Sequence, residues 1–144
     1  MDTKDFLIHA RRFAFLIRPK GIYSKLRPSE AFVFMNIIDL HKKKIDILPS
    51  VLSSYCDLSR SAIAQILNQL QKKELIERFV DPTDRRRILI VPVKKNMAFC
   101  FHEDLEMFEA LRDHLNDEDF VQLAHLLEKT NGFLKSLESK EESL

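Results

Sequence analysis

The scarcity of residues that interrupt helices is the feature that most constrains the fold of this chain. Only 2 Gly and 5 Pro occur among its 144 residues, whereas these two types together usually make up roughly 12% of a protein. So few breakers favour long helices and leave little room for the many turns of a sandwich or barrel. With 45% hydrophobic residues, the chain belongs to the globular class, and its length predicts one domain, 1–144.

Several other classes of protein are disfavoured by simple features. The first twelve residues lack the apolar stretch and the cleavage site of a signal peptide. The longest apolar runs, such as 13–17 and 31–35, are too short to span a bilayer. Cys56 and Cys100 are too few for a disulfide scaffold. We therefore expect a cytoplasmic protein with reduced thiols that does not associate with membranes.

Apolar residues at helical spacing predict three helices in the first part of the chain. The first begins near Phe6 and ends at residues 18–21. Pro28 and Pro49 suit the first turns of two more helices, over residues 28–41 and 49–55. The residues expected to face inward are Ala31, Phe34, Met35 and Ile38 in the second helix, and Leu52 and Tyr55 in the third.

Residues 59–73 form the most informative segment. Ser59 is a good N-cap, and one face of the predicted helix is an apolar stripe of Ile63, Ile66, Leu67 and Leu70. The opposite face is small, polar and mostly uncharged, and consists of Ser61, Ala64, Gln65, Asn68, Gln69 and Lys72.

After this helix, the hydrophobic period changes. Segments 74–80 and 87–93 are rich in β-branched and aromatic residues and flank a turn that contains Asp and Pro. We predict a β-hairpin whose tip carries Arg85, Arg86 and Arg87. Two further helical stretches follow, one from Met97 to residue 115 and one that begins at Asn116 as its N-cap.

The order of these elements predicts a mostly α winged helix-turn-helix protein with additional helices at both ends of the chain. Gln and Asn match adenine in the major groove, and Ser pairs with several bases. Arginine guanidinium groups suit phosphates and the electronegative minor groove. The candidate DNA-binding residues are Ser59, Arg60, Ser61, Ala64, Gln65, Asn68, Gln69, Lys72, Arg85, Arg86 and Arg87.

At these residues the sequence resembles the MarR family (multiple antibiotic resistance regulators) of bacterial transcription factors. The resemblance is carried by LSRSAIAQILNQLQKKELIER, residues 58–78, and by DPTDRRR, residues 81–87. It implies a winged helix-turn-helix over 27–93 and dimerisation helices over 1–20 and 97–138. It also implies a homodimer that binds a pseudopalindromic operator in double-stranded DNA. Many members lose DNA affinity when a small molecule or an oxidant acts between these parts, so an effector is implied as well.

The chain departs from the family pattern around the hairpin. Asp57 and Glu74 stand where Gly is common, although Asp tolerates left-handed geometry fairly well. After the hairpin, VKKN at residues 93–96 replaces the usual L-T-x-K-G. These differences concern the entry to and the exit from the hairpin and leave the polar helix face unchanged.

Charge is distributed unevenly along the chain. The formal net charge of +1 gives no reason to propose a nucleic-acid binder. However, residues 59–96 contain 9 basic and 4 acidic residues, whereas residues 97–144 contain 4 basic and 12 acidic residues. The segment predicted to bind DNA, residues 59–96, is therefore basic. The acidic segment 97–144 would limit non-specific binding to DNA.

Each of these features also has an ordinary structural interpretation. The arginines fit a solubilising hairpin tip, and one of them fits a salt bridge to Asp81 or Asp84; we favour Arg86 for the groove. The polar face fits a solvated helix surface. Their occurrence together favours DNA contact, with a winged-helix protein–protein module as the alternative.

Cys56 and Cys100 raise the alternative of a redox-sensing regulator. Oxidant-sensing relatives usually carry the reactive Cys in the first helix, which has none here, so buried thiols are favoured. His102 and Glu106, with His41, suggest a metal site, but two ligands one turn apart do not complete one. We expect no metal.

The chain contains 11 Phe and no Trp. Phe13, Phe34, Phe99 and Phe101 fit the lining of an effector pocket, although core and interface roles are more common for such residues. No paired nucleophile and base or phosphate-binding Gly loop is present, so we expect neither an enzyme nor a cofactor. The predicted function is sequence-specific transcriptional regulation, with repression favoured over activation.

Overall fold

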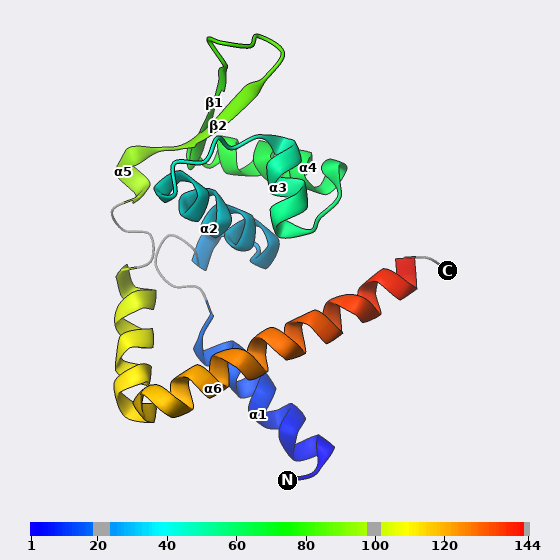
Figure 1. Cartoon of the computed structure of the whole chain (residues 1–144), viewed down its shortest axis with the longest axis vertical. Helices are drawn as coiled ribbons and strands as arrows, with labels where there is room; N and C mark the ends of the chain where they lie inside the picture. The colour runs from blue at the N-terminus through cyan, green and yellow to red at the C-terminus, as the bar shows by residue number, and fades with distance from the viewer. Residues whose placement is uncertain (19–23, 98–101, 143–144) are drawn as a thin grey trace. The chain divides into compact units, whose positions relative to one another are not determined.

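The computed structural model describes the backbone of residues 1–18, 24–97 and 102–142 (Figure 1). It confirms the predicted mostly α fold with one hairpin. The chain separates into two compact units, Met1–Glu103 and Asp104–Leu144. In order, its elements are α1 (Thr3–Leu16), α2 (Pro28–Lys42), α3 (Pro49–Cys56), α4 (Arg60–Lys72), β1 (Ile76–Val80), β2 (Ile88–Pro92), α5 (Lys94–Met97) and α6 (His102–Glu142).

The core of the first unit lies between α2, α3, α4 and the root of the hairpin. The predicted stripe of α4 is buried in full. The predictions for Met35 and Tyr55 are wrong, because these side chains are 44% and 48% exposed. Ile37 of α2 and Cys56 of α3 are buried in this core. The other residues predicted to face inward in these two helices, Ala31, Phe34, Ile38 and Leu52, are buried as predicted.

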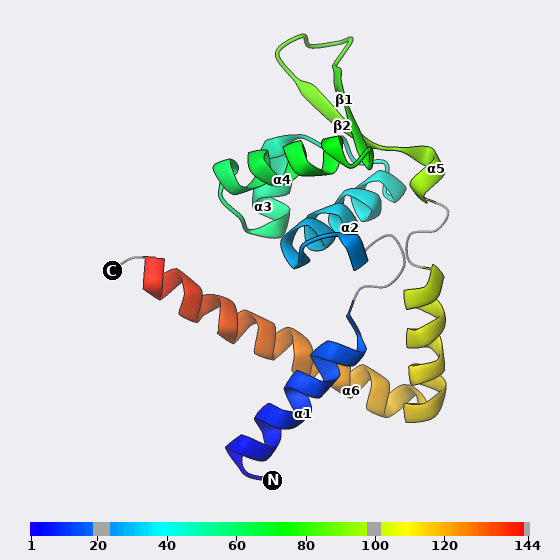
Figure 2. The same ribbon diagram turned by 180° about the vertical axis from the view of Figure 1, so that it is seen from behind.

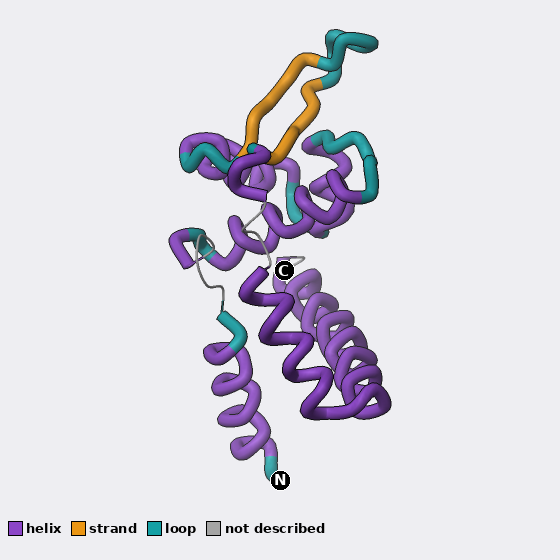
Figure 3. Tube along the Cα trace, turned by 90° about the vertical axis from the view of Figure 1, so that its left-hand side faces the viewer, coloured by secondary structure: helices purple, strands orange, loops and turns teal. Residues whose placement is uncertain are grey.

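The hairpin is a two-stranded antiparallel sheet in which Arg78 pairs with Ile90 and Val80 pairs with Ile88. It projects away from the helices α2–α4 (Figure 3). Its root is joined to the rest of the unit by main-chain hydrogen bonds. Ile90 N donates to Ile47 O, before α3, and Val93 N donates to Leu75 O, each across 2.9 Å. The hairpin is therefore anchored by backbone as well as by side chains.

Three chain reversals use the left-handed conformation without glycine. Lys44, Asp57 and Glu74 have φ values of 57°, 56° and 59°. Asp57 ends α3 in this conformation, as its tolerance for the left-handed region leads us to expect. Glu74 turns the chain from α4 into the hairpin despite its Cβ. As a result β1 begins at Ile76, two residues later than predicted.

The terminal helices begin at side-chain caps. In α1, Asp5 N donates to Asp2 Oδ1 across 2.8 Å, which starts the helix three residues before the predicted Phe6. In α6, Asp119 N donates to Asn116 Oδ1 across 3.0 Å. Asn116 has non-helical angles, and the long helix bends there, as predicted for an N-cap. The second half of α6 continues through Gly132 to Glu142. Residues 98–101 of the predicted helix lie outside the described residues.

Candidate nucleic-acid interface

The polar face of α4 is exposed along its whole length. Its side chains are held outward because the opposite stripe is buried between α2 and α3. Ser59 accepts a hydrogen bond from Ala62 N across 3.1 Å and so caps the helix. The exposed predicted residues of this segment are Ser59, Arg60, Ser61, Ala64, Gln65, Asn68, Gln69 and Lys72.

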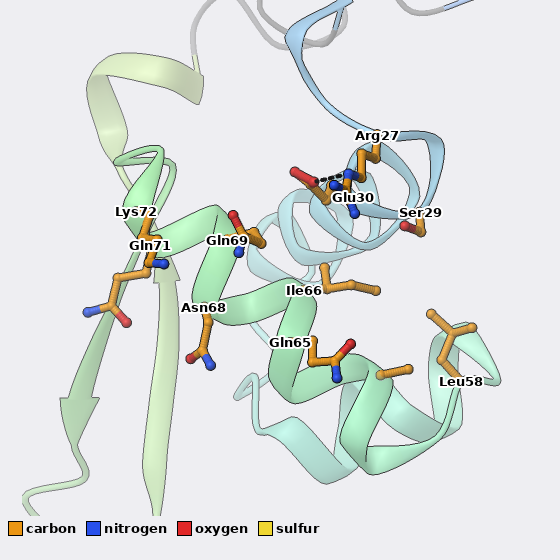
Figure 4. Close-up of a pocket in the computed structure, with 11 residues that line it drawn as sticks. Arg27, Ser29, Glu30, Leu58, Gln65, Ile66, Asn68, Gln69, Gln71 and Lys72 are labelled. Carbon is orange, nitrogen blue, oxygen red and sulfur yellow. Dashed lines mark ion pairs between the residues drawn. The ribbon is translucent and has the colours of Figure 1, made fainter.

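An open groove runs between this face and the N-terminal end of α2. Gln65, Asn68 and Gln69 of α4 line one side, and Arg27 and Ser29 line the other (Figure 4). The contribution from α2 is a feature that the sequence patterns did not predict. Leu58, Ala62 and Ile66 also line the groove, so it offers hydrogen-bonding groups beside apolar side chains.

An ion pair with one buried partner joins the two helices at this groove, which Glu30 also lines. Lys73 Nζ lies 2.6 Å from Glu30 Oε2, and the Glu30 side chain is only 4% exposed. Arg27 Nε lies 4.0 Å from the other carboxylate oxygen. Lys73 is the C-cap of α4, so the pair fixes the end of this helix against the start of α2.

The three wing arginines have different surroundings. Arg87 is half-buried, and its guanidinium nitrogens lie 3.0 Å from Asp81 Oδ2 and 3.4 Å from Asp46 Oδ2. Arg86 is exposed, with its Nε 3.2 Å from Asp84 Oδ1. Arg85 is exposed and has no hydrogen-bond or ion-pair partner in the described part of the chain. The predicted salt bridge that holds the turn is therefore present, and Arg87 makes the buried one.

The turn itself is organised around Asp81. Thr83 N and Thr83 Oγ1 donate to Asp81 Oδ1 across 2.9 and 2.7 Å. These bonds, followed by the charge of Arg87, hold the pKa of Asp81 below its ordinary value. The pKa of Asp84 is also lowered, mainly by its bonds with Arg86. The same bonds and charges that lower the two pKa values connect both carboxylates to neighbouring residues of the turn.

A further arginine, Arg78 of β1, lies beside the α4 face. Its Nη2 donates to Asn68 Oδ1 across 2.9 Å. Figure 2 shows α4 next to the root of the hairpin. Arg78 is absent from the predicted site. Its only signal in the sequence is a positive charge in a predicted strand, where Glu77 stands directly before it.

The remaining candidate sites receive less support from the described residues. Cys56 is buried, and burial raises the pKa of its thiol. Cys100, Phe99 and Phe101 lie outside the described residues, as does the side chain of His102. Phe34 belongs to the core of the winged-helix unit. No group of three or more metal-ligating side chains occurs among the residues searched, which are the described ones.

The fold and its exposed face define a winged helix-turn-helix protein. Residues 26–87, which contain the recognition-helix and hairpin motifs, match the model of the MarR family. This match confirms the resemblance drawn from the sequence over these residues.

Solved structures of similar fold cover nearly the whole chain. Streptococcus pneumoniae FabT, determined in complex with DNA, is 22% identical, with 93% of this chain and 96% of that chain covered and a TM-score of 0.66. The Staphylococcus aureus MepR–DNA complex is 18% identical, with 93% and 99% covered and a TM-score of 0.65. The transcriptional regulator SlyA is 13% identical, with 92% and 93% covered and a TM-score of 0.64.

No protein of curated function gives a significant sequence match. Within the described residues, no helix combines the length and apolar character that a membrane crossing requires.

Proposed function

We propose that this chain is a sequence-specific DNA-binding transcriptional regulator that acts as a homodimer on a pseudopalindromic operator. The observation that carries the proposal is the exposed polar face of α4 next to a hairpin tipped with exposed arginines. An α-helix fits the major groove, and its Gln, Asn and Ser side chains match base edges. Arginines on a projecting hairpin reach the neighbouring phosphates or minor groove.

Exposed apolar residues on the terminal helices support the homodimer. In α1, Phe6 and Phe15 are 60% and 61% exposed, and in α6, Val121 and Phe133 are 52% and 61% exposed. Large apolar side chains of this number are usually covered by a partner. Because the helices at both ends of the chain carry them, a second copy is the partner we propose. A twofold dimer would place two α4 helices in successive major grooves about 34 Å apart.

Repression follows from this arrangement if the operator overlaps a promoter, because the bound dimer then blocks transcription. Release by a small-molecule effector is part of the same proposal, supported by the family resemblance. A redox mechanism through Cys56 is disfavoured by the burial and the raised pKa of its thiol.

The test is selection of bound fragments from a random double-stranded DNA library by the full chain. We expect enrichment of a twofold-symmetric sequence. Fluorescence anisotropy on this sequence should then show a steep salt dependence. Neutralisation of about 6–10 phosphates lowers the affinity by roughly 10³–10⁵ between 50 and 200 mM salt. A flat salt response, or no enriched sequence, would indicate a protein–protein module instead.

A matched pair of variants separates the wing from bulk charge. Arg86→Ala should reduce the affinity for all sequences and lower the salt slope by about one. Lys129→Ala removes the same charge from exposed α6 and should leave both quantities unchanged. Equal effects of the two variants would argue against a specific wing contact.

A further inference from the structure

The Asn68 side chain does not offer its whole amide to a ligand. A guanidinium group contains only donors, so the 2.9 Å bond from Arg78 Nη2 fixes the amide with its oxygen toward β1. Asn68 Nδ2 has no hydrogen-bond partner in the described part of the chain. The exposed side chain therefore turns its two N–H donors outward and its acceptor toward a positive charge.

Arg78 is held in this position by its surroundings. It is half-buried on β1 and lies opposite Ile90 of β2 in the strand register. Its Nε is buried and has no hydrogen-bond partner among the described residues. The adjacent Leu75 and Ile76 are 2% and 1% exposed, so the start of the strand cannot shift without disturbing the core. Asn68 Oδ1 is therefore a fixed part of the surroundings of Arg78.

This arrangement changes the base that Asn68 is suited to read. A free Asn amide pairs with adenine by accepting from N6 and donating to N7. With Oδ1 next to a guanidinium, an incoming N6 donor would meet a cation, whereas the two N–H groups match acceptors. Guanine presents two acceptors, N7 and O6, on the same edge.

We infer that Arg78 is a positioning residue that sets the specificity of Asn68. In bound DNA, the base pair that Asn68 contacts is then G·C rather than A·T. The inference rests on the proposed function and refines it, because a side chain outside the recognition helix determines what that helix reads. It also replaces the simple expectation that Asn in this helix matches adenine.

The experiment is parallel selection from the same random duplex library with five full-length proteins: the unmodified chain and its Asn68→Ala, Arg78→Met, Arg78→Lys and Gln65→Ala variants. The position that loses its preference in Asn68→Ala is the one read by Asn68, and in the unmodified protein it should be G·C. In Arg78→Met we expect the ratio of G·C to A·T enrichment there to fall about fivefold or more, because a bidentate contact discriminates by roughly 1–3 kcal/mol. Arg78→Lys retains a cationic donor and should keep G·C.

Gln65→Ala is the matched control, since Gln65 is an exposed amide on the same face of α4. The position lost in Gln65→Ala should be unchanged in Arg78→Met. An A·T preference at the Asn68 position of the unmodified protein would overturn the inference even if Arg78→Met did not fold. The same profile in Arg78→Met and the unmodified chain would also overturn it. If the unmodified chain enriches no sequence, the proposed function itself fails, which is a different outcome.

Discussion

The ion pair between Lys73 and Glu30 leads to the most direct stability prediction, because one of its partners is almost completely buried. Lys73→Met keeps the length of the side chain and removes its charge. The Glu30 carboxylate, with its side chain 4% exposed, would then lose the ammonium group that lies 2.6 Å away. Burial of an uncompensated charge is among the few single changes that destabilise a domain strongly.

The magnitude follows from the exposure of the two partners. Removal of one partner from a fully buried pair costs about 3–5 kcal/mol. Lys73 is 35% exposed, and Arg27 Nε remains 4.0 Å from Glu30, so we expect a smaller cost of about 2–3 kcal/mol. At this chain length each kcal/mol lowers Tm by roughly 3–4 °C. The expected fall in Tm is therefore about 6–12 °C.

Thermal and urea unfolding followed by far-UV circular dichroism would measure the change. The same Lys73→Met substitution should be made in a Glu30→Gln background, where no buried charge is left unpaired. There it should cost about 1 kcal/mol or less, the value of an ordinary hydrogen bond. If Lys73→Met costs as much in the Glu30→Gln background as in the unmodified chain, the loss does not arise from an unpaired carboxylate and this reasoning is refuted.

Three further predictions concern the wing, the thiol and the terminal helices. Because the folded pKa of Asp81 is lowered, its contribution to stability is present above the unfolded pKa of about 3.9 and is lost as the pH falls through the folded pKa. Thr83→Val should raise this pKa in a ¹³C carboxyl titration, whereas Arg85→Ala should not; an unchanged value in Thr83→Val would contradict the assignment of its cause. For the thiol, the test uses a Cys100→Ser background. Cys56 should react with a thiol reagent far more slowly in the folded protein than in denaturant, because its thiol is buried and its pKa is raised. Equal rates would show that the thiol is accessible. For the terminal helices, Val121→Glu should shift the chain toward a monomer in light scattering and weaken operator binding. Gln122→Glu, at the next exposed position, should change neither quantity. A dimer of unchanged affinity in Val121→Glu would place the interface elsewhere.

The elements and the polar face could be predicted because they depend on local patterns. The stripe of α4 follows from apolar spacing alone, and Ser59 and Asn116 are recognised as caps by residue type. The predictions for Met35 and Tyr55 are wrong, because periodicity alone does not decide whether a residue at the edge of an apolar face is buried. That depends on the neighbouring elements, here the packing of α2 and α3 against α4.

The pairing of distant side chains could not be obtained from sequence patterns. Arg87 contacts Asp46, which is 41 residues away, and Lys73 contacts Glu30, which is 43 residues away. Such contacts depend on the tertiary fold, and each charge has many alternative partners along the chain. Among the wing arginines, the motif predicted that one would hold the turn, but only the structure assigns the buried bond to Arg87. Arg78 could not be assigned a role until β1 was placed beside α4.

The two main-chain bonds at the root of the hairpin have a mechanical consequence. Ile90 is bonded to Ile47 and Val93 to Leu75 through backbone atoms, so a movement of the hairpin away from α2–α4 would break these bonds and leave main-chain groups without their partners. We therefore expect the wing to move together with the recognition helix. In the proposed dimer, release from DNA would then depend on the spacing or the angle between the two winged-helix heads. Substitutions of side chains at the root would alter the stability of the head without uncoupling the wing from the recognition helix.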